Sequence, residues 1–304
     1  MARTDPSAAG AAAAAPWGPA LALVFNAATW GLSWWPFRQL ESLGLHPLWT
    51  TALVYGMAVI TLLATRPRAL GEVLRTPSLW VLVVASGTTN AAFNWAVTIG
   101  DVVRVVLLFY LMPLWAVGLA RVLLGERLTA LALLRVAMAL AGAVVVLWPA
   151  EGGWPLPRSL PEWLGVLGGF SFALNNVMLR HQAHRSESAR ALAMFVGGTL
   201  VAGTLAFTLT AAGTADWPPP PQAAWVVGAV ALGVLFLASN LALQYGAARL
   251  PANVTAVVMI TEVFFASASA VWLGGGTLTP ALLAGGTLIV LAALLAARPA
   301  GEAG

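Results

Sequence analysis

Long apolar stretches alternate along the chain with short clusters of glycine, proline and arginine. Each stretch has about 20 mostly apolar residues, which is the length that an α-helix needs to cross the hydrocarbon core of a bilayer. The pattern therefore predicts ten transmembrane helices joined by short connections, with no room for a separate soluble domain. Their predicted ranges are 17–37, 47–65, 78–99, 103–124, 130–148, 162–182, 189–212, 223–247, 252–273 and 279–297.

The composition points to the same fold class. Of the 304 residues, 60% are hydrophobic and 9% are charged, whereas soluble domains carry about 25% charged residues. We therefore predict an all-α integral membrane protein. The apolar stretch that follows the alanine-rich start reaches full spanning length, so residues 1–16 are interpreted as a disordered tail and not as a cleaved signal peptide.

The arginines predict how the helices are oriented. All 15 basic residues are arginine, and cytoplasmic loops carry most of the basic residues of a membrane protein. With the N-terminus in the cytoplasm, twelve arginines fall at cytoplasmic ends and three, Arg38, Arg104 and Arg158, fall outside. Both termini are therefore expected in the cytoplasm, and the net charge of +4 needs no nucleic-acid partner. We expect Arg38 and Arg104 to pair with Glu41 and Asp101; steering of anionic groups is the alternative role.

The missing residue types argue against an enzyme. Without lysine the chain has no Walker-A loop and no Schiff-base chemistry, and without cysteine it has no thiol nucleophile and no thiolate metal site. The three histidines lie near segment ends and form no metal-binding pattern. We therefore expect no catalytic residue, no cofactor and no metal.

The two halves of the chain align with one another. Residues 124–129 recur as 273–279 with one residue inserted, and Asn94–Gly100 aligns with Asn240–Gly246. Trp30–Arg38 aligns with Phe172–Arg180, which places Ser33 over Asn175 and Trp34 over Asn176. Chance similarity between alanine- and leucine-rich helices is the alternative, but the shared Asn and Gly spacing favours a true repeat.

An odd number of helices in each half makes the repeat inverted. Five predicted spans per half mean that the second half enters the membrane from the opposite side, an architecture common among secondary transporters. The predicted organisation is a tail over 1–16, a first five-helix repeat over 17–148, a linker over 149–161, a second repeat over 162–298 and a tail over 299–304.

Two motifs identify a family resemblance that covers essentially the whole chain. Leu108-Phe-Tyr-Leu-Met-Pro113, followed by Leu123-Leu-Gly-Glu126-Arg-Leu-Thr129, resembles the fourth-helix proline and the Gly-Glu turn of EamA-type members of the drug/metabolite transporter superfamily. Within that family, Trp30-Gly-Leu-Ser-Trp-Trp and the tryptophan-rich spans resemble YddG-like amino-acid exporters. The resemblance implies a ten-helix exporter of small metabolites in the bacterial inner membrane, with a cavity lined by helices 1, 3, 4, 6, 8 and 9.

Amides inside the predicted spans are the first candidate site residues. A polar group in hydrocarbon is costly unless it faces a partner or a wet cavity, and an amide both donates and accepts, which suits a zwitterionic substrate. Hydrogen bonding between helices is the alternative role for each of them. The candidates are Asn90, Asn94, Asn175, Asn176, Asn240 and Gln244.

Aromatic residues and one proline complete the predicted cavity. Trp30 and Trp34 lie four residues apart on the first span with Ser33 beside them, and Tyr110 precedes Pro113 by one turn. Their rings can stack on an aromatic or aliphatic substrate, or they pack the bundle. Pro113 is expected to bend the fourth span and to free a carbonyl towards the cavity.

Glu262 is the one acidic residue well inside a predicted span. A carboxylate at that depth costs about 2.5–3.5 kcal/mol to insert, so it needs water, a proton or a partner. We hypothesise that Glu262 titrates in a proton-coupled cycle or meets a substrate amine. The alternative is a structural carboxyl paired with Arg104 or Arg249.

The predicted function is secondary active transport. The leading interpretation is a transporter that exports amino acids, aromatic ones included, or similar small metabolites by alternating access. A carrier of drugs or other metabolites on the same fold is the alternative, and a non-transporting membrane scaffold is disfavoured by the polar residues inside the spans. The expected partners are a small solute and membrane lipid, the oligomeric state stays open, and a monomer suffices.

Overall fold

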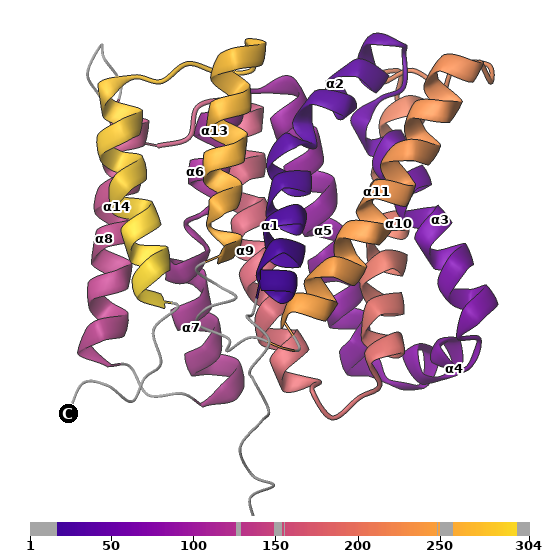
Figure 1. Cartoon of the computed structure of the whole chain (residues 1–304), viewed down its shortest axis with the longest axis horizontal. Helices are drawn as coiled ribbons and strands as arrows, with labels where there is room; N and C mark the ends of the chain where they lie inside the picture. The colour runs from indigo at the N-terminus through magenta and orange to yellow at the C-terminus, as the bar shows by residue number, and fades with distance from the viewer. Residues whose placement is uncertain are drawn as a thin grey trace, which may run out of the picture.

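The computed structural model describes residues 17–125, 129–148, 154, 156–247, 249 and 258–296, and every regular element in these ranges is a helix. The helices run alongside one another in a bundle (Figure 1). They are α1 (Trp17–Leu32), α2 (Trp34–Ser42), α3 (Pro47–Thr65), α4 (Arg68–Arg75), α5 (Pro77–Ile99), α6 (Val102–Phe109), α7 (Met112–Leu124), α8 (Ala130–Leu147), α9 (Leu160–His181), α10 (Glu187–Ala211), α11 (Ala223–Ala247), α13 (Thr261–Leu273) and α14 (Pro280–Ala296). The expected tails over 1–16 and 299–304, most of the linker and Glu126 lie outside the described residues.

Five segments among the described residues are long and apolar enough to cross a membrane by length and composition. They are α3, Val102–Leu124, α8, α10 and Ala223–Leu243 of α11. The bent pair of α4 and α5 makes a sixth candidate, and α13 and α14 are apolar but shorter. The structure therefore contains a multi-pass helical bundle, whereas the predicted number of ten spans remains a prediction.

Helix α4 was not predicted. Its eight residues turn by 100° from α5 and lie across one end of the bundle (Figure 1). Ala69 and Val73 are buried on one side, while Leu70 and Leu74 are exposed on the other. A search for stretches of about 20 apolar residues passes over a short amphipathic helix of this kind, which typically lies along a membrane surface.

The first predicted span is broken at Ser33. The structure ends α1 at Leu32 and continues as α2 to Ser42, beyond the predicted limit at residue 37. Pro36 explains the break, because it has no N–H to donate to the carbonyl of Leu32 four residues earlier. The hydroxyl of Ser33 donates to the carbonyl of Trp30 at 2.8 Å.

The fourth predicted span is interrupted rather than bent. Helix α6 ends at Phe109 and α7 begins at Met112, so Pro113 lies in the first turn of α7 and not inside a continuous helix. Proline is well tolerated in a first turn, where its missing N–H costs little. The Phe109 carbonyl that it leaves free lies against Gly169 of α9, where a Cβ would collide with it. The expectation that this carbonyl faces a cavity is therefore wrong.

The two halves of the chain are interleaved. Helix α1 packs on α11 and α13 of the second half, and α9 packs on α5, α6 and α7 of the first half. Helices α3 and α10 pair with each other, as do α8 and α14. Gly87 of α5 and Gly197 of α10 meet backbone to backbone, because a Cβ on Gly87 would collide with the carbonyl of Gly197.

The aligned turns of the two halves have the same local geometry. Gly125 and Gly274 end α7 and α13 in the left-handed region, with φ of 69° and 73°, which favours glycine. Thr129 and Thr279 then cap α8 and α14 by accepting hydrogen bonds from the backbone N–H groups of Ala132 and Leu282.

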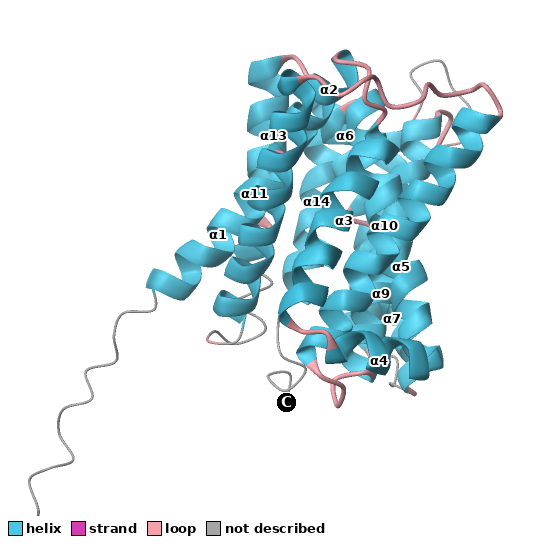
Figure 2. Cartoon of the chain, turned by 90° about the vertical axis from the view of Figure 1, so that its right-hand side faces the viewer, coloured by secondary structure: helices cyan, strands magenta, loops and turns pink. Residues whose placement is uncertain are grey.

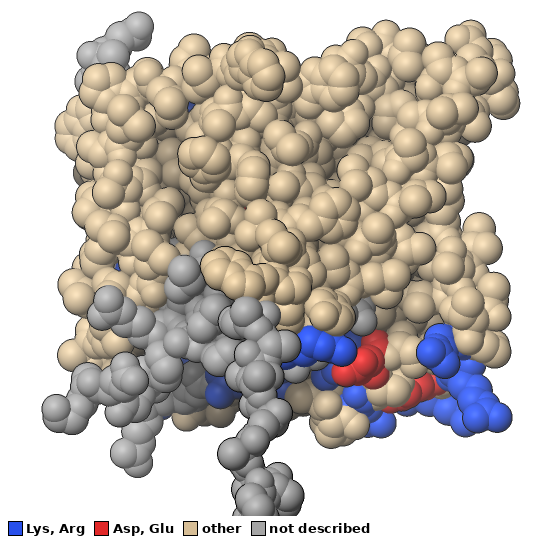
Figure 3. Space-filling model, in the orientation of Figure 1, with Lys and Arg blue, Asp and Glu red and all other residues tan. Residues whose placement is uncertain are grey.

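The charged residues separate the two ends of the bundle. On the face shown in Figure 3, arginine and acidic side chains gather along the lower edge. Helix α4 and the turn 182–186 lie together at this end, where the Ser186 hydroxyl donates to Glu72 of α4. We call it the basic end because of the arginines gathered there. The opposite end, formed by α2 and the turns at 100–101 and 274–279, is called the outer end (Figure 2).

Candidate substrate site

A row of aromatic rings crosses the interior of the bundle. The rings come from α1, α3, α5, α6 and α11 and from the residue after α6, and consecutive centroids lie between 4.6 and 6.4 Å apart. Stacked and edge-to-face contacts at such distances stabilise one another. In order, the members of this aromatic row are Tyr55, Phe236, Trp30, Phe93, Phe109 and Tyr110.

Each end of the aromatic row carries a polar partner. The hydroxyl of Tyr55 donates to the amide oxygen of Asn90, whose Nδ2 donates to the carbonyl of Ser86 at 2.8 Å. At the other end, the hydroxyl of Tyr110 donates to Oε2 of Glu262 at 3.2 Å. Trp30, Tyr110, Asn90 and Glu262, all predicted from sequence, therefore belong to one connected arrangement.

Glu262 lies at the start of α13, where α13 crosses α1. A Cβ on Gly31 would lie 2.7 Å from the Glu262 carbonyl oxygen, so the two backbones are in close contact. Helix α1 carries no titratable residue, and Arg104, the one arginine of α6, pairs with Glu162 at 2.7 Å. Among the described residues, the hydroxyl of Tyr110 is the hydrogen-bond partner of this carboxylate.

The ion pairs considered for Arg104 and Arg249 are wrong. Arg104 pairs with Glu162 and not with Asp101, which instead accepts from the Arg104 backbone N–H as the N-cap of α6. Arg249 lies over the ring of Tyr245 at 4.0 Å and donates to its carbonyl, so it is not a partner of Glu262. Arg38 donates to backbone carbonyls at the end of α5, and its charge also interacts with the expected carboxylates of Glu41 and Asp101.

Four buried amide oxygens have no hydrogen-bond partner among the described residues: one, Oε1 of Gln182, follows α9 at the basic end, and the other three belong to asparagines inside helices. Asn94 donates to Thr51 at 3.1 Å and Asn26 donates to the hydroxyl of Ser239 at 2.7 Å, yet Oδ1 of each is unsatisfied, as is Oδ1 of Asn175. Buried polar atoms usually have a partner, so these oxygens are candidates to accept from a solute or from water. Sequence reasoning gave Asn26 no place among the site residues, although its position inside an apolar span was a usable signal.

The other predicted site residues are dispersed. Trp34 is 2% exposed and donates from Nε1 to the hydroxyl of Ser269 at 3.0 Å, towards the outer end. Ser33 is buried against its own helix, Asn176 is exposed on α9, and Asn240 is half-buried on α11. The side chain of Gln244 lies outside the described residues.

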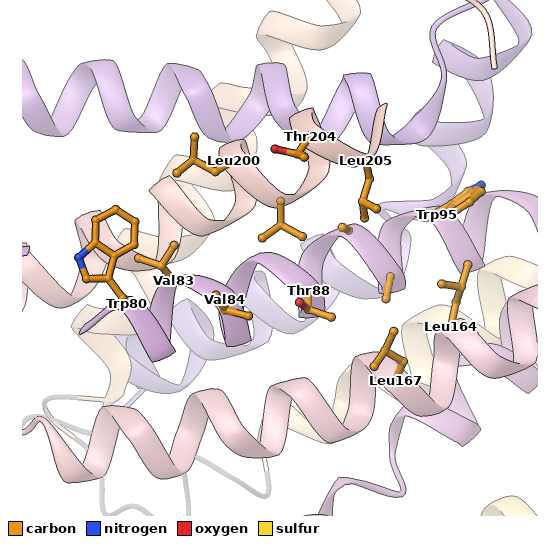
Figure 4. A pocket seen from close by; sticks show the side chains of 13 residues that line it. Trp80, Val83, Val84, Thr88, Trp95, Leu164, Leu167, Leu200, Thr204 and Leu205 are labelled. Carbon is orange, nitrogen blue, oxygen red and sulfur yellow. The ribbon is translucent and has the colours of Figure 1, made fainter. Parts of the chain in front are cut away.

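The larger of two described pockets is not at the aromatic row. It has a volume of about 490 Å³, opens on the side of the bundle between α5, α9 and α10, and is lined mostly by apolar residues (Figure 4). Trp80 and Trp95 lie at its two ends in this view. A second pocket of about 300 Å³ lies between α3 and α11 and includes Met57 and Gly233. Neither contains a residue predicted for the substrate site.

No group of three or more histidine, aspartate or glutamate side chains gathers among the described residues in a way that could hold a metal ion. Among the residues that the structure describes, the polar groups around the aromatic row are amides, hydroxyls and the carboxylate of Glu262. Such groups bind solutes through hydrogen bonds and one charge.

The fold and this interior define a class, a helical membrane bundle with polar groups and aromatic rings between its helices. Residues 17–148 match the model of the EamA-like transporter family, so this part of the chain carries an EamA-like domain. The match indicates a multi-pass membrane transporter of small metabolites.

Solved structures support the fold. Fifteen chains match, and one of them, described as "Crystal structure of protein", is 18% identical, with a TM-score of 0.59, over 91% of this chain and 96% of its own. At this identity the likeness concerns the fold alone. No curated protein matches the chain.

Proposed function

We propose that this protein is a secondary transporter that exports small metabolites, amino acids among them, from the cytoplasm of a bacterium across its inner membrane. The observation that carries the proposal is the aromatic row, which crosses the interior and ends on the carboxylate of Glu262. Membrane interiors rarely hold an ionisable group without a functional reason. The basic end is the cytoplasmic side in this proposal, with both termini there.

We further propose that residues 17–148 and 162–298 are two inverted five-helix repeats that rock against each other. The contact of α1 with α11 has its counterpart in the contact of α9 with α5, and the contact of α1 with α13 has its counterpart in those of α9 with α6 and α7. The matching glycine and threonine caps support the same relation. Repeats of this kind support alternating access around a central site.

The interior supplies contacts for each part of an amino acid. Trp30 and Tyr110 contact its apolar side chain, the carboxylate of Glu262 receives its ammonium group, and the amides of Asn26, Asn94 and Asn175 bind its carboxylate and remaining polar atoms. A proton competes with the ammonium group for Glu262, so that each displaces the other. Trp34, Asn176, Asn240 and Gln244 take part in other conformations of the cycle.

A second candidate function is export of organic cations or other drug-like metabolites on the same fold. It is favoured by the absence, among the described residues of α1, α6 and α13, of an arginine that faces Glu262. No arginine is then available to bind a carboxylate of the solute. A solute that has a positive charge and no carboxylate therefore leaves no negative group without a partner when it binds Glu262. The choice between the two functions depends on which solutes are transported.

Counterflow in proteoliposomes tests the proposal. A panel of labelled amino acids, supplemented with organic amines, is offered to liposomes preloaded with the unlabelled solute. We expect exchange of at least one amino acid, loss of its pH dependence in Glu262→Gln, and at least a tenfold drop in rate, about 1.4 kcal/mol. Glu187→Gln, at an exposed position on α10, is the matched control and retains the rate.

Exchange of amines alone supports the second candidate. A folded protein that exchanges no member of the panel contradicts both, and unchanged rate and pH dependence in Glu262→Gln remove Glu262 from the site.

A further inference from the structure

The pocket of about 490 Å³ is a groove along the side of the bundle, which we call the side groove. Helix α5 forms its floor, and α9 and α10, which both pack on α5, form its walls. Trp80, near the start of α5, and Trp95, near its end, lie at the two ends of the groove (Figure 4). Fifteen residues of helix separate them, which is about 22 Å of a hydrocarbon core about 30 Å thick. The groove therefore runs through most of the apolar part of the membrane.

Small side chains explain why the side groove is hollow. Thr88, Ala91 and Ala92 line its floor on α5. Larger side chains line its walls, and two of these, Leu167 of α9 and Leu200 of α10, are 43% and 48% exposed. In a membrane, an apolar surface that opens sideways is covered by lipid chains or by another protein.

The dimensions of the side groove favour a single hydrocarbon chain. A chain about 5 Å wide and about 22 Å long has a volume of about 430 Å³, close to the volume of about 490 Å³ of the groove. A helix of a second copy, about 10 Å wide over the same length, would occupy about 1,700 Å³. The groove therefore fits an acyl chain and is too narrow for a helix.

Helix α4 lies where the side groove approaches the basic end. It packs on α10 and α5, two of the three helices that form the groove, and Figure 2 shows it at the lower end of the bundle, below them. Its last residue, Arg75, comes five residues before Trp80. A lipid whose chain enters the groove at Trp80 therefore has its headgroup close to α4.

Helix α4 offers separate surfaces to lipid chains and to charge. Leu70 and Leu74 lie one turn apart and are 40% and 59% exposed. Arg68 and Arg75 lie two turns apart on a different face, both exposed, and neither has an ion-pair or hydrogen-bond partner among the described residues. The carboxylate of Glu72 is occupied by hydrogen bonds from the N-cap of α10. Two guanidinium groups beside exposed leucines suit a lipid phosphate at the membrane surface.

We propose that α4 and the side groove form a binding site for an anionic phospholipid. The lipid phosphate binds Arg68 and Arg75, and one acyl chain extends from Trp80 along α5 between α9 and α10. With the basic end in the cytoplasm, as proposed above, the lipid belongs to the inner leaflet. The site shares no residue with the aromatic row, so it is separate from the proposed solute site.

Native mass spectrometry of the purified protein in detergent tests the site. The first bound lipid is followed while phosphatidylglycerol or phosphatidylcholine with the same acyl chains is added. We expect phosphatidylglycerol to bind about tenfold more tightly, because two arginines contact a net negative charge that phosphatidylcholine balances with its own choline. Glycerol phosphate, which has no chains, and diacylglycerol, which has no phosphate, are each expected to bind at least about tenfold more weakly than phosphatidylglycerol.

The charged part of the site is tested by a double substitution. Arg68→Gln combined with Arg75→Gln is expected to abolish the preference for phosphatidylglycerol and to leave the binding of phosphatidylcholine unchanged. Arg158→Gln removes an exposed arginine at the outer end. It is the matched control, and it retains the preference.

The side groove is tested by filling it. Thr88→Trp occupies the middle of the groove, so we expect both phospholipids to bind at least about fivefold more weakly. Leu200→Trp, on the wall formed by α10, serves if Thr88→Trp does not fold. Val81→Trp, at a 42% exposed position of α5 outside the groove, is the matched control and leaves both affinities unchanged.

Four results overturn the proposal. The parent binds the two phospholipids equally, or the preference survives the double arginine substitution. Glycerol phosphate binds as tightly as phosphatidylglycerol, which makes the ligand a free phosphate ester. Folded Thr88→Trp and Leu200→Trp bind both lipids as the parent does, and if these variants also dissociate a dimer of the parent, the groove belongs to a second copy. The measurement needs no solute, so its outcome is independent of the counterflow experiment.

Discussion

Proline positions decide where two helices of this protein break. Pro36 removes a backbone donor just after Ser33, and Pro113 does the same just after the turn at residues 110–111. The second break places Tyr110 between helices, where its hydroxyl reaches Glu262 on α13. A single residue without an N–H therefore helps to build the site.

His46 makes a residue-scale prediction about pH. Its Nδ1 accepts from the backbone N–H of Leu48 as the N-cap of α3, and burial lowers its pKa from the usual 6.5. The folded state thus favours the neutral ring. The contribution of His46 to stability is complete above pH 6.5 and declines as the pH falls towards the lowered value.

Thermal unfolding in detergent checks this expectation. The melting temperature of the parent falls when the pH is lowered from about 7.5 to about 5.5, because protonation removes an N-cap that stabilises a helix by about 1 kcal/mol. His46→Asn keeps a capping side chain that does not titrate, so a smaller fall is expected. An equal fall in both proteins contradicts the assignment.

At the scale of residues, the sequence indicated which polar side chains lie inside the bundle but not all of their partners. The cost of burying polar groups singled out Glu262 and Asn90 without a structure. The partner expected for Arg104 was wrong, because a guanidinium can pair with a carboxylate that is distant in sequence, here Glu162. The backbone carbonyls that Arg38 binds in addition to its expected carboxylates were not predicted either.

At the scale of helices, close packing depends on glycine. The seam between α5 and α10 has no space for a side chain at Gly197, where a Cβ would collide with the carbonyl of Val83. Helix α9 approaches α6 in the same way at Gly165, where a Cβ would lie 3.1 Å from the carbonyl of Val105. Such contacts fix how deeply one helix enters the groove of another.

Substitution at this seam separates packing from helix propensity. Gly197→Ala is expected to lower the free energy of unfolding by about 1–3 kcal/mol, because the added methyl group meets backbone that cannot yield. Gly71→Ala on α4 meets nothing within 4 Å, so it should raise the free energy of unfolding by about 0.5–1 kcal/mol. Denaturation of both variants in one detergent measures the difference. If Gly197→Ala has a higher free energy of unfolding than the parent, the close backbone contact between α5 and α10 at Gly197 is contradicted.

Helix ranges followed from the apolar pattern more reliably than helix breaks did. The range 47–65 predicted for α3 and the range 223–247 predicted for α11 are those of the structure. Helix α4 and the interruptions at Ser33 and Tyr110 were not predicted. The length of an apolar stretch reflects the thickness of the bilayer, so it predicts spanning helices well. The two breaks depend instead on the missing N–H of one proline each, and α4 is too short to stand out as an apolar stretch.

At the scale of the whole molecule, charge asymmetry predicts orientation. The turn with Thr214, between α10 and α11, lies at the end away from the basic one, and Ser188 lies at the start of α10 beside Ser186. In intact bacterial cells, with the outer membrane permeabilised, an impermeant maleimide is expected to label Thr214→Cys, and to label Ser188→Cys only after lysis.

The parent chain, which has no cysteine, is the control for both the Thr214→Cys and the Ser188→Cys variants. Labelling of Ser188→Cys in unlysed cells reverses the proposed orientation, and labelling of both positions from one side contradicts a membrane crossing by α10. The overall class of the protein was predictable from its composition, whereas the contacts that join the helices at the outer end, such as those of Arg38 with α5, were not.

The interleaving of the two halves has a consequence for biosynthesis. Helix α1 packs on α11 and α13 near the end of the chain, and α9 packs on α5, α6 and α7. The ribosome must therefore synthesise most of the second half before the first half has its native neighbours. Until then, Gly87 and the carbonyl of Phe109, both later covered by α10 and α9, face lipid or the insertion machinery. Neither half is a complete folding unit, and two fragments divided near residue 154 would have to assemble with each other as they are inserted.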